Sequence, residues 1–501
     1  LIEAAAKRDI RYILCSNESS AATMAGVYSA MRFRPGVVST GVGPGAAAAA
    51  LGVAHLFLER SPVLVLTDRY GEAEFRRLPR QRLEHDQLFR PITKGTFTIS
   101  ALDAAATMRR ALELSLDGRP GPVHVDLPYD VMLAAAEESH FPKGAVRRRF
   151  STDAVPSGFS AVADAIHAAK RPAVIAGLQI GRRGIAAERA LAQFVEKLGA
   201  PVLASLGAKG TLPENHPLAA GVFRGVASET ALLEKADLFL LIGFDPVEIF
   251  TPGVWRYNAP VISIDETPFR EGPYVPAIEV IAGIETALSR LTDLVMPGSG
   301  WTREDIESYN SRRQSALLKR SDAGVHPAAV VRLTREILPD DGILTVDAGQ
   351  HKVVTSDLWE ARRARGFFSS SGLGTMAVSI PAAIAAKLLE PKAPVVCFTG
   401  DGGFLMRVGD LETAAREQTP IVVVVFNDRL LNLVKLQQDR RGLRNLGVSF
   451  ANSDFAAIAR GFGFAARRVE TEPEYAAALA EALGSGRPFL IDVAIDPNGY
   501  I

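Results

Sequence analysis

Residues 393–403 read Ala-Pro-Val-Val-Cys-Phe-Thr-Gly-Asp-Gly-Gly, an apolar run that ends in glycines around one aspartate. The apolar part predicts a buried strand of a parallel sheet. A second apolar run at residues 420–426 predicts the neighbouring strand, and residues 405–418 between the two have the helical period. This stretch therefore predicts a strand–helix–strand unit and, with it, an α/β fold built on parallel sheet.

Polar side chains follow both predicted strands. Asp401 follows the first strand, and the pair Asn427 and Asp428 follows the second. Open α/β sheets bind ligands at the carboxyl ends of their strands. A hard cation prefers oxygen ligands, and Gly402 and Gly403 would let backbone N–H groups approach a phosphate closely. The pattern indicates a diphosphate site bridged by Mg²⁺, with ordinary turns between strand and helix as the alternative.

The bulk composition is that of a globular enzyme with several domains. A chain of 501 residues is too long for a single core and suggests about two to four domains. Its 48% hydrophobic and 22% charged residues argue against a disordered chain. Lys+Arg and Asp+Glu number 56 each, and neither sign forms a long block. We therefore expect neither nucleic acid nor a membrane surface as a partner.

The two cysteines, Cys15 and Cys397, both lie in apolar, strand-like surroundings, where core packing is the expected role. The sequence contains no secretory segment and no apolar segment of membrane length. Together these features predict a reducing compartment, the cytoplasm. The chain starts at Leu1 as if inside a helix without a cap, so we expect the natural protein to begin earlier.

Three α/β blocks follow one another along the chain, at residues 1–135, 159–300 and 326–501. Irregular or polar linkers at residues 137–158 and 296–320 separate them. Each block alternates β-branched runs with Ala-rich helical stretches, which predicts three consecutive doubly wound, mostly parallel sheets. The strands are expected at residues 36–40, 62–67, 122–126, 172–177, 201–204, 237–243, 260–265, 343–347, 366–370, 394–399, 420–426 and 488–493.

Gly400-Asp401-Gly402 is followed about two dozen residues later by Asn427-Asp428, and this pattern resembles the thiamine diphosphate motif. The whole chain resembles the thiamine diphosphate-dependent acetolactate synthase-like superfamily, and its flavin-free catabolic members more than the biosynthetic enzymes. The three blocks then correspond to a pyrimidine-binding, a central Rossmann-like and a diphosphate-binding domain. The resemblance implies thiamine diphosphate and Mg²⁺ as cofactors, with Asp401, Asp428 and the carbonyl of Leu430 as metal ligands. The second member of the pair is usually Asn, and here it is Asp428.

The segment Ser16-Asn17-Glu18 resembles the start of the family's helix that carries the catalytic glutamate. Glu18 would share a proton with the aminopyrimidine ring of the cofactor, and burial would keep that proton on the pair by raising the carboxyl pKa. The family usually has a His before this Glu, and here it is Asn17. The alternative is a glutamate in a first helical turn, favoured by the helix dipole, with Asn17 or Ser16 as the cap.

Two further segments resemble cofactor-binding parts of the family. Gly349, Gln350 and His351 follow a predicted strand and match the turn that contacts the diphosphate, with a helix-capping turn as the alternative. Gly374 would accept a hydrogen bond from the aminopyrimidine through its carbonyl. Met376 would be the apolar wedge that bends the cofactor, and the alternative for it is a core filler.

Residues 41–46 also follow a strand and open an Ala-rich helix. They look like a dinucleotide fingerprint, but Pro44 and the missing Gly–x–x–Gly spacing weaken that reading. The family's Gly-Pro-Gly turn of the pyrimidine-binding domain is a better match.

Four residues fall where the resemblance places the substrate pocket: Gln81, Lys94, Val434 and Gln437. Lys94 could meet a substrate carboxylate, and a solvated loop lysine is the alternative. Gln437 stands where the biosynthetic enzymes carry a Trp, which argues against a branched-chain-biosynthesis preference. Residues 243–248 resemble the flavin-free type, so FAD is not favoured as a cofactor.

The resemblance implies a decarboxylating carboligase, which splits a small 2-oxo acid and transfers the acyl unit to an acceptor. In this family Glu18 and the diphosphate site would come from different subunits, which implies a homodimer or a homotetramer. A 2-oxo acid decarboxylase or 2-hydroxyacyl lyase of the same superfamily is the main alternative. More distant alternatives are a flavin or nicotinamide oxidoreductase and a catalytically silent cofactor-binding protein. The donor and acceptor substrates stay open.

Overall fold

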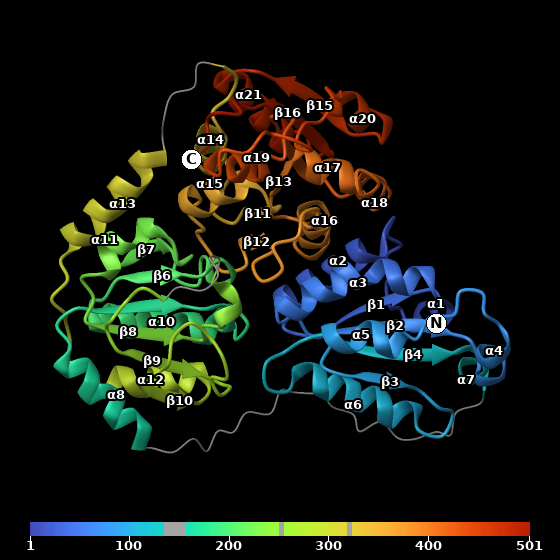
Figure 1. Ribbon diagram of the computed structural model, residues 1–501, viewed down its shortest axis with the longest axis horizontal. Helices are drawn as coiled ribbons and strands as arrows, with labels where there is room; N and C mark the ends of the chain where they lie inside the picture. Colours follow the sequence, from blue (N-terminus) through green and yellow to red (C-terminus); the bar gives the residue numbers. More distant parts are fainter. Residues whose placement is uncertain (135–156, 250–254, 318–322, 501) are drawn as a thin grey trace. The chain divides into compact units, whose positions relative to one another are not determined.

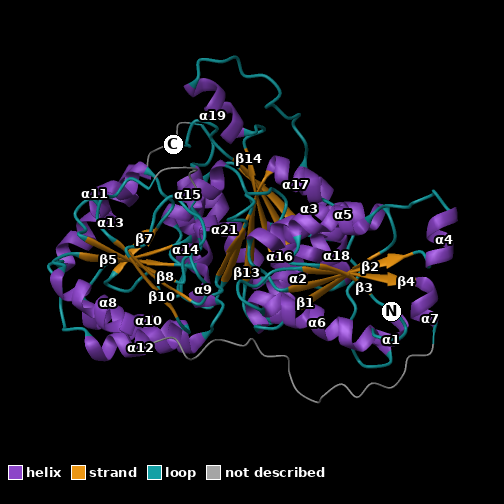
Figure 2. Cartoon of the chain, turned by 60° about the horizontal axis from the view of Figure 1, so that its bottom comes forward, coloured by secondary structure: helices purple, strands orange, loops and turns teal. Residues whose placement is uncertain are grey.

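The computed structural model describes residues 1–134, 157–249, 255–317 and 323–500 (Figure 1). Most of the linker expected at residues 137–158 lies outside these ranges. Three sheets of parallel strands account for the described strands, and helices flank each sheet (Figure 2). The α/β fold with three parallel-sheet domains is thereby confirmed. The chain divides into two compact units, one with the first sheet and one with the second and third.

The first sheet, blue to cyan in Figure 1, has the order β1-β2-β4-β3. Its strands are β1 (Gly36–Thr40), β2 (Val63–Arg69), β3 (Thr96–Thr98) and β4 (Val123–Pro128). The helices of this unit are α1 (Ile2–Ala6), α2 (Glu18–Arg32), α3 (Pro44–Leu58), α4 (Glu72–Arg77), α5 (His85–Phe89), α6 (Ala104–Leu116) and α7 (Tyr129–Leu133). Helices α2 and α3 pack closely because Gly52 has no side chain: a Cβ there would lie 2.7 Å from that of Ala22.

The second sheet has the order β10-β9-β8-β5-β6-β7 and hydrophobic clusters on both faces. Its strands are β5 (Pro172–Ala176), β6 (Val202–Ala204), β7 (Ala219–Val222), β8 (Leu238–Ile242), β9 (Val261–Asp265) and β10 (Ile278–Ile281). The helices around it are α8 (Ser157–Ala168), α9 (Leu178–Gly181), α10 (Ile185–Leu198), α11 (Thr230–Leu233), α12 (Ile284–Leu294) and α13 (Arg303–Leu317).

The third sheet has the order β12-β11-β13-β14-β16-β15. Its strands are β11 (Ile343–Val346), β12 (Phe367–Ser369), β13 (Val395–Gly400), β14 (Val422–Asn427), β15 (Ala465–Val469) and β16 (Phe489–Ala494). The helices are α14 (Pro327–Ile337), α15 (Gln350–Leu358), α16 (Ser379–Leu389), α17 (Asp401–Arg407), α18 (Asp410–Arg416), α19 (Asn432–Arg440), α20 (Phe455–Gly461) and α21 (Glu472–Gly484). Strands β13 and β14 are neighbours and parallel, as the sequence predicts.

The single helix expected at residues 405–418 is instead two short helices, α17 and α18. Gly409 lies between them, and glycine is a poor residue for a helix interior. Helix α17 also begins earlier than expected, at Asp401, so the metal-ligand candidate is the first residue of a helix.

Both cysteines are free thiols: Cys397 is buried in β13, and Cys15 is half-buried with its sulfur 3.5 Å from that of Met24. Among the described helices, none combines the length and the hydropathy needed to cross a membrane.

Candidate active site

The carboxyl ends of β13 and β14 bring the predicted acid pair together. Asp401 is buried, and its Oδ1 accepts the backbone N–H of Gly402 at 2.6 Å. Burial and the charge of Asp428 raise the pKa of Asp401 to about 7, against the opposing effect of N–H groups from Gly402, Arg429 and Leu430. Asp401 Oδ2 is buried without a hydrogen-bond partner in the described part of the chain. A cation would satisfy that oxygen and remove the repulsion between the two carboxylates.

Asp428 is half-buried and better satisfied than Asp401. Its Oδ1 accepts the N–H of Leu430 at 3.0 Å, and its Oδ2 accepts the side-chain amide of Asn432 at 2.9 Å. Burial raises the pKa of Asp428 to about 6, although these two bonds act in the opposite direction. The structure thus brings Asp401 and Asp428 together beside the Leu430 backbone, whose N–H donates to Asp428, whereas the Asn427 amide donates to Asp492 instead.

Glycine is required at the turn after β13. A Cβ at Gly403 would lie 2.5 Å from Asp347 Oδ2, and one at Gly402 would lie 3.1 Å from the Phe450 ring. The distance at Gly403 is too short for a side chain, and a Cβ at Gly402 would require the Phe450 ring to shift by a few tenths of an ångström. The glycine backbone at this turn is therefore bare. Bare backbone suits the close approach of a phosphate.

Asp347, which the sequence analysis did not assign a role, connects three segments of this site. Its Oδ1 accepts the N–H groups of Val378 and Ser379 at 2.7 and 2.8 Å, and its Oδ2 accepts the Thr399 hydroxyl at 2.8 Å. Burial raises the pKa of this fully buried carboxyl, against the effect of those hydrogen bonds. Asp347 therefore fixes the turn it begins, the loop that carries Met376, and the end of β13 relative to one another.

The turn at residues 349–351 adopts a conformation that needs glycine. Gly349 has φ of 154°, and a Cβ there would lie 2.6 Å from the His351 ring. That ring is buried and stacks on Phe426 with centroids 5.2 Å apart. Burial and the charge of Lys352 lower the pKa of His351 to about 3, so the imidazole is neutral at physiological pH. Its Nε2 has no hydrogen-bond partner among the described residues, and Gln350 beside it is buried.

Met376 lies in a loop that has left-handed backbone on both sides of it and a strained residue, Ala377, directly after it. Gly374 has φ of 65°, and Ala377, which has a side chain, has φ of 67°. A non-glycine residue in the left-handed region costs about 1–3 kcal/mol and is found preferentially at functional sites. The loop is fixed by the Thr375 N–H, which donates to the Ser370 hydroxyl at 3.2 Å. Met376 itself is half-buried.

Glu18, in the first unit, is the first residue of α2. The Asn17 side chain caps this helix by accepting the N–H of Ser19 at 2.9 Å, so Asn17 takes the capping role that the sequence left open. Glu18 is half-buried in the single chain. The Gly-Pro-Gly turn lies beside it, because a Cβ at Gly45 would be 3.5 Å from Glu18 Oε1.

Three family models match the chain in order. They describe the N-terminal thiamine pyrophosphate-binding domain (residues 1–88), the central domain of thiamine pyrophosphate enzymes (residues 159–291) and the C-terminal thiamine pyrophosphate-binding domain (residues 347–493). A probable acetolactate synthase large subunit from Methanococcus aeolicus is 31% identical over 98% of this chain and 87% of its own length.

The chain belongs to the thiamine diphosphate-dependent acetolactate synthase-like superfamily. Two further relatives are a catabolic acetolactate synthase from Raoultella terrigena, 31% identical over 97% of this chain and 88% of its own length, and an acetolactate synthase from Bacillus subtilis, 29% identical over 98% and 87%. This superfamily membership makes the chain a thiamine diphosphate-dependent enzyme of the carboligase type.

Within this superfamily member, the four predicted pocket residues lie in different settings. Gln81 is exposed and has φ of 56°, and its carbonyl oxygen would be 2.5 Å from a Cβ at Gly43. The Lys94 ammonium donates to the carbonyls of Leu114 and Asp117 at the end of α6. The Lys94 ammonium thus has backbone partners at the end of α6, and its predicted contact with a substrate carboxylate stays a prediction. Val434 and Gln437 are exposed on α19.

Sequence reasoning missed two further residues beside the acid pair. Asn432 donates to Asp428 and also to the carbonyl of Pro497 at 2.9 Å. Burial, first, and the charges of Asp428 and Asp401 raise the pKa of the Tyr500 hydroxyl. Asn432 follows Asp428 by four residues and could have been suspected, whereas nothing in the sequence connects Tyr500 to the site.

At the carboxyl ends of the strands of the second sheet, a carboxylate of the chain itself accepts the hydrogen bonds of the loops. Glu248 is buried, and its oxygens accept the N–H of Leu178 at 3.0 and 3.1 Å, the N–H of Asp245 at 3.1 Å and the Ser205 hydroxyl. These donors come from the loops after β5, β8 and β6. Burial raises the pKa of Glu248 to about 8, against the effect of the hydrogen bonds.

Proposed function

We propose that this enzyme binds thiamine diphosphate through a Mg²⁺ ion held by Asp401, Asp428 and the carbonyl of Leu430. The single observation that carries this proposal is the buried Oδ2 of Asp401, which lies beside a second carboxylate and has no partner among the residues that the structure describes. Oxygen ligands of this kind suit Mg²⁺, which keeps near-octahedral coordination and is commonly held by one or two carboxylates plus phosphate oxygens.

The surrounding residues would position the organic part of the cofactor. The backbone at Gly402 and Gly403, together with Gln350 and the neutral His351, would contact the diphosphate. Met376, fixed through the Asp347 hydrogen bonds to the residues after it, would keep the two rings of the cofactor in a bent arrangement. When bound, thiamine diphosphate supplies a thiazolium carbon that adds to a carbonyl and accepts the electrons released with carbon dioxide.

Glu18 would hold the proton that activates the aminopyrimidine ring, with the Gly-Pro-Gly turn at Gly45 beside it. Glu18 belongs to the first unit and the acid pair to the second. In line with the superfamily resemblance, we propose a homodimer, or a homotetramer built from it, in which partner subunits complete the site. We further propose a cytoplasmic enzyme whose donor is a small 2-oxo acid and whose acceptor is a carbonyl compound, as the relatives' acetolactate synthase names suggest.

FAD is not part of this proposal. The edge of the second sheet is the place where a Rossmann-like domain would receive a dinucleotide phosphate, and there the Glu248 carboxylate takes up the N–H groups of Leu178 and Asp245. A phosphate would have to displace this buried carboxylate.

The deciding experiment measures carbon dioxide release from pyruvate with thiamine diphosphate and Mg²⁺, for the wild type, Glu18→Gln and the exposed control Glu113→Gln. General acid–base groups contribute about 100- to 10,000-fold, so we expect Glu18→Gln to lose turnover on that scale and Glu113→Gln to retain it. Product analysis then separates acetolactate, expected of a carboligase, from acetaldehyde, expected of a simple decarboxylase. A wild type that binds no thiamine diphosphate would refute the proposal, and a wild type that binds it but ignores pyruvate would refute the donor.

A further inference from the structure

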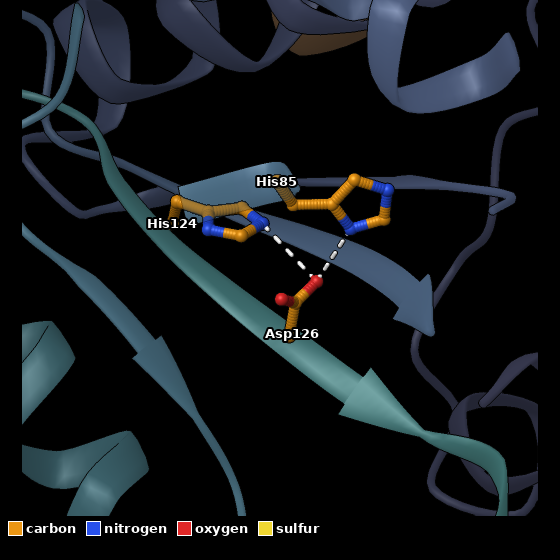
Figure 3. A group of neighbouring side chains, drawn as sticks. All are labelled: His85, His124 and Asp126. Atoms are coloured by element: carbon orange, nitrogen blue, oxygen red, sulfur yellow. Dashed lines mark hydrogen bonds and ion pairs between the residues drawn. The ribbon is translucent and has the colours of Figure 1, made fainter. Parts of the chain in front are cut away.

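A buried cluster in the first unit combines two histidines and an aspartate (Figure 3), and a threonine hydroxyl lies among them. His85 begins α5, His124 and Asp126 lie on β4, and Thr67 lies on the neighbouring strand β2. His85 Nδ1 is 2.7 Å from Asp126 Oδ1. Thr67 Oγ1 is 2.7 Å from that oxygen, 2.7 Å from His124 Nε2 and 3.4 Å from His85 Nδ1.

The inner polar atoms of this cluster can satisfy one another without a metal ion. The Thr67 hydroxyl donates to Asp126 and accepts from His124 Nε2–H, while His85 Nδ1–H donates to Asp126; this assignment of the protons follows from the network. The hydroxyl oxygen lies among the three metal-ligating atoms, where an ion would have to sit. Burial would raise the pKa of Asp126, but the hydrogen bonds from His85 and Thr67 and the neighbouring His124 imidazole, 3.5 Å away, together hold it well below its ordinary value. Asp126 is thus a buried, charged acceptor.

Asp126 also contacts both ends of the segment at residues 70–84. Arg69, immediately before the segment, has its Nε 3.8 Å from Asp126 Oδ2, and His85 follows the segment immediately. The Arg69 guanidinium also lies 4.1 Å from the centroid of the Phe75 ring. Arg82 lies 5.8 Å from the same ring and donates to the Phe75 carbonyl at 3.1 Å. Arg69 and Arg82 therefore both lie against Phe75. The Asp126 carboxylate holds the segment at both ends, through Arg69 on one side and His85 on the other.

Gln81 lies in this segment, in a left-handed conformation with φ of 56°. Its backbone packs on Gly43, where a Cβ would be 2.5 Å from the Gln81 carbonyl oxygen. Gly43 belongs to the turn whose Gly45 lies beside Glu18. A strained backbone conformation persists only where the surrounding structure imposes it. Here the contacts that hold the segment impose the strained conformation of Gln81, next to the Gly-Pro-Gly turn that lies beside Glu18.

We propose that Asp126 and His85 are positioning residues that fix the Gln81 segment against the Gly-Pro-Gly turn and thereby set how the enzyme receives its 2-oxo acid substrate. This inference rests on the proposed function for the identity of the substrate. The two histidines of the cluster belong to different elements. His85 directly follows the segment that contains Gln81, whereas His124 lies on strand β4. Both are equally buried, with each side chain 1% exposed.

The first test compares His85→Leu, His85→Asn and His124→Leu by steady-state kinetics with pyruvate. A displaced positioning group can cost about 10- to 100-fold, so we expect His85→Leu to raise KM for pyruvate about tenfold with a smaller change in kcat. His85→Asn, whose amide can donate from the position of Nδ1, should restore most of the wild-type KM. His124→Leu should lower stability like His85→Leu but leave KM near the wild-type value. Equal KM values for the two Leu variants would overturn the proposal.

A double-mutant cycle connects the cluster to Gln81. If His85 acts through Gln81, then Gln81→Ala should raise KM in the wild type and add little in the His85→Leu background. Additive losses in the two backgrounds would mean that the two residues act independently, which contradicts the proposal.

Backbone hydrogen exchange at Phe75 and Leu78, whose N–H groups donate to the carbonyls of Gly71 and Glu74 within the segment, gives a readout that does not need turnover, so the proposal stays testable if the enzyme proves inactive with pyruvate. We expect exchange in this segment to speed up about tenfold or more in His85→Leu and in Asp126→Asn, and to stay unchanged in His124→Leu. Unchanged exchange in both His85→Leu and Asp126→Asn would overturn the proposal. So would a stoichiometric metal ion in the purified wild type that is lost in His85→Leu and retained in Asp401→Ala.

Discussion

The carboxyl edges of the second and third sheets carry buried acids in comparable places but in opposite states. At the third sheet, Asp401 Oδ2 has no partner among the described residues and faces a second carboxylate, Asp428. At the second sheet, both oxygens of Glu248 accept hydrogen bonds from the chain. Among the described residues, the third sheet thus leaves one carboxylate oxygen that a ligand could bind. At the second sheet, donors from the chain itself bind both carboxylate oxygens.

The difference shows how two sheets of the same class come to have different roles. A buried carboxylate without partners destabilises a fold, and such a cost persists where function requires it. The Asp401 edge has the properties of a binding site because one buried carboxylate oxygen, Asp401 Oδ2, has no hydrogen-bond partner among the described residues. Glu248 has a structural role instead, because it accepts hydrogen bonds from the loops after three strands and so connects these loops.

Removal of the Asp401 carboxylate should have the largest effect. We expect Asp401→Ala to weaken Mg²⁺-dependent binding of thiamine diphosphate by more than about 100-fold, beyond the 10- to 100-fold typical for an outer partner of a metal site. Asp428→Asn, which keeps an oxygen ligand and restores the family's usual amide, should lose about tenfold or less. Isothermal titration at fixed Mg²⁺ measures both, and similar affinities for Asp401→Ala and the wild type would contradict the assignment of this edge as the cofactor site.

The second prediction concerns the completed edge. Glu248→Ala leaves the buried N–H groups of Leu178 and Asp245 and the Ser205 hydroxyl without their acceptor, so we expect a loss of about 3 kcal/mol in the free energy of unfolding. Glu248→Gln keeps one acceptor oxygen and should lose about half as much. Denaturant unfolding measures the loss. Any Glu248 variant that folds should bind the cofactor with the wild-type affinity. A lower affinity in a folded variant would contradict a purely structural role for Glu248.

A smaller effect of opposite sign is expected at the incomplete edge. Asp401→Asn removes one of two desolvated carboxylates, so without Mg²⁺ and cofactor the variant should be more stable than the wild type by about 1 kcal/mol. The comparison is made by thermal unfolding in the presence of a chelator. If the variant is less stable than the wild type under those conditions, the Asp401 carboxylate has partners that stabilise the fold. That result would contradict the expectation that this carboxylate destabilises the cofactor-free protein.

The last effect is a slope of stability with pH that originates at Glu248. Its pKa is about 8 in the folded protein against an ordinary value of 4.5, so the folded state holds a proton that the unfolded state has lost. The contribution is therefore fully present below the ordinary value and is lost as the pH rises through about 8. Glu248→Gln cannot titrate, and its unfolding midpoint should fall less than that of the wild type between about pH 5 and about pH 8. Parallel curves would place the titration elsewhere.

The sequence located the interior strands of all three sheets and missed four strands, β3, β7, β10 and β15. All four lie at sheet edges. Three of them are only partly buried, because an edge strand packs against one neighbour and needs no continuous apolar run. The interior strand β14, by contrast, is buried throughout and reads as an unbroken apolar run.

The candidate site divides in the same way. Asp401, Asp428 and Glu18 belong to motifs with a fixed local spacing and could be named from the sequence. Asp347 and Asp126 could not, because their roles depend on partners from other elements. Asp347 accepts N–H groups from residues 31 and 32 positions further along the chain, and Asp126 pairs with a histidine 41 positions earlier.

The sequence by itself determined the superfamily, the cofactor class and the order of the three domains, because apolar runs and motif spacings are properties of short stretches of chain. Only the tertiary structure decided which buried carboxylates lack partners. Glu248 is completed by Leu178, 70 residues away, while Asp401 Oδ2 has no partner in the described part of the chain although its own turn donates to Asp401 Oδ1. Hydrogen-bond saturation depends on which donors the fold brings within about 3 Å, and no local pattern of residues contains that information.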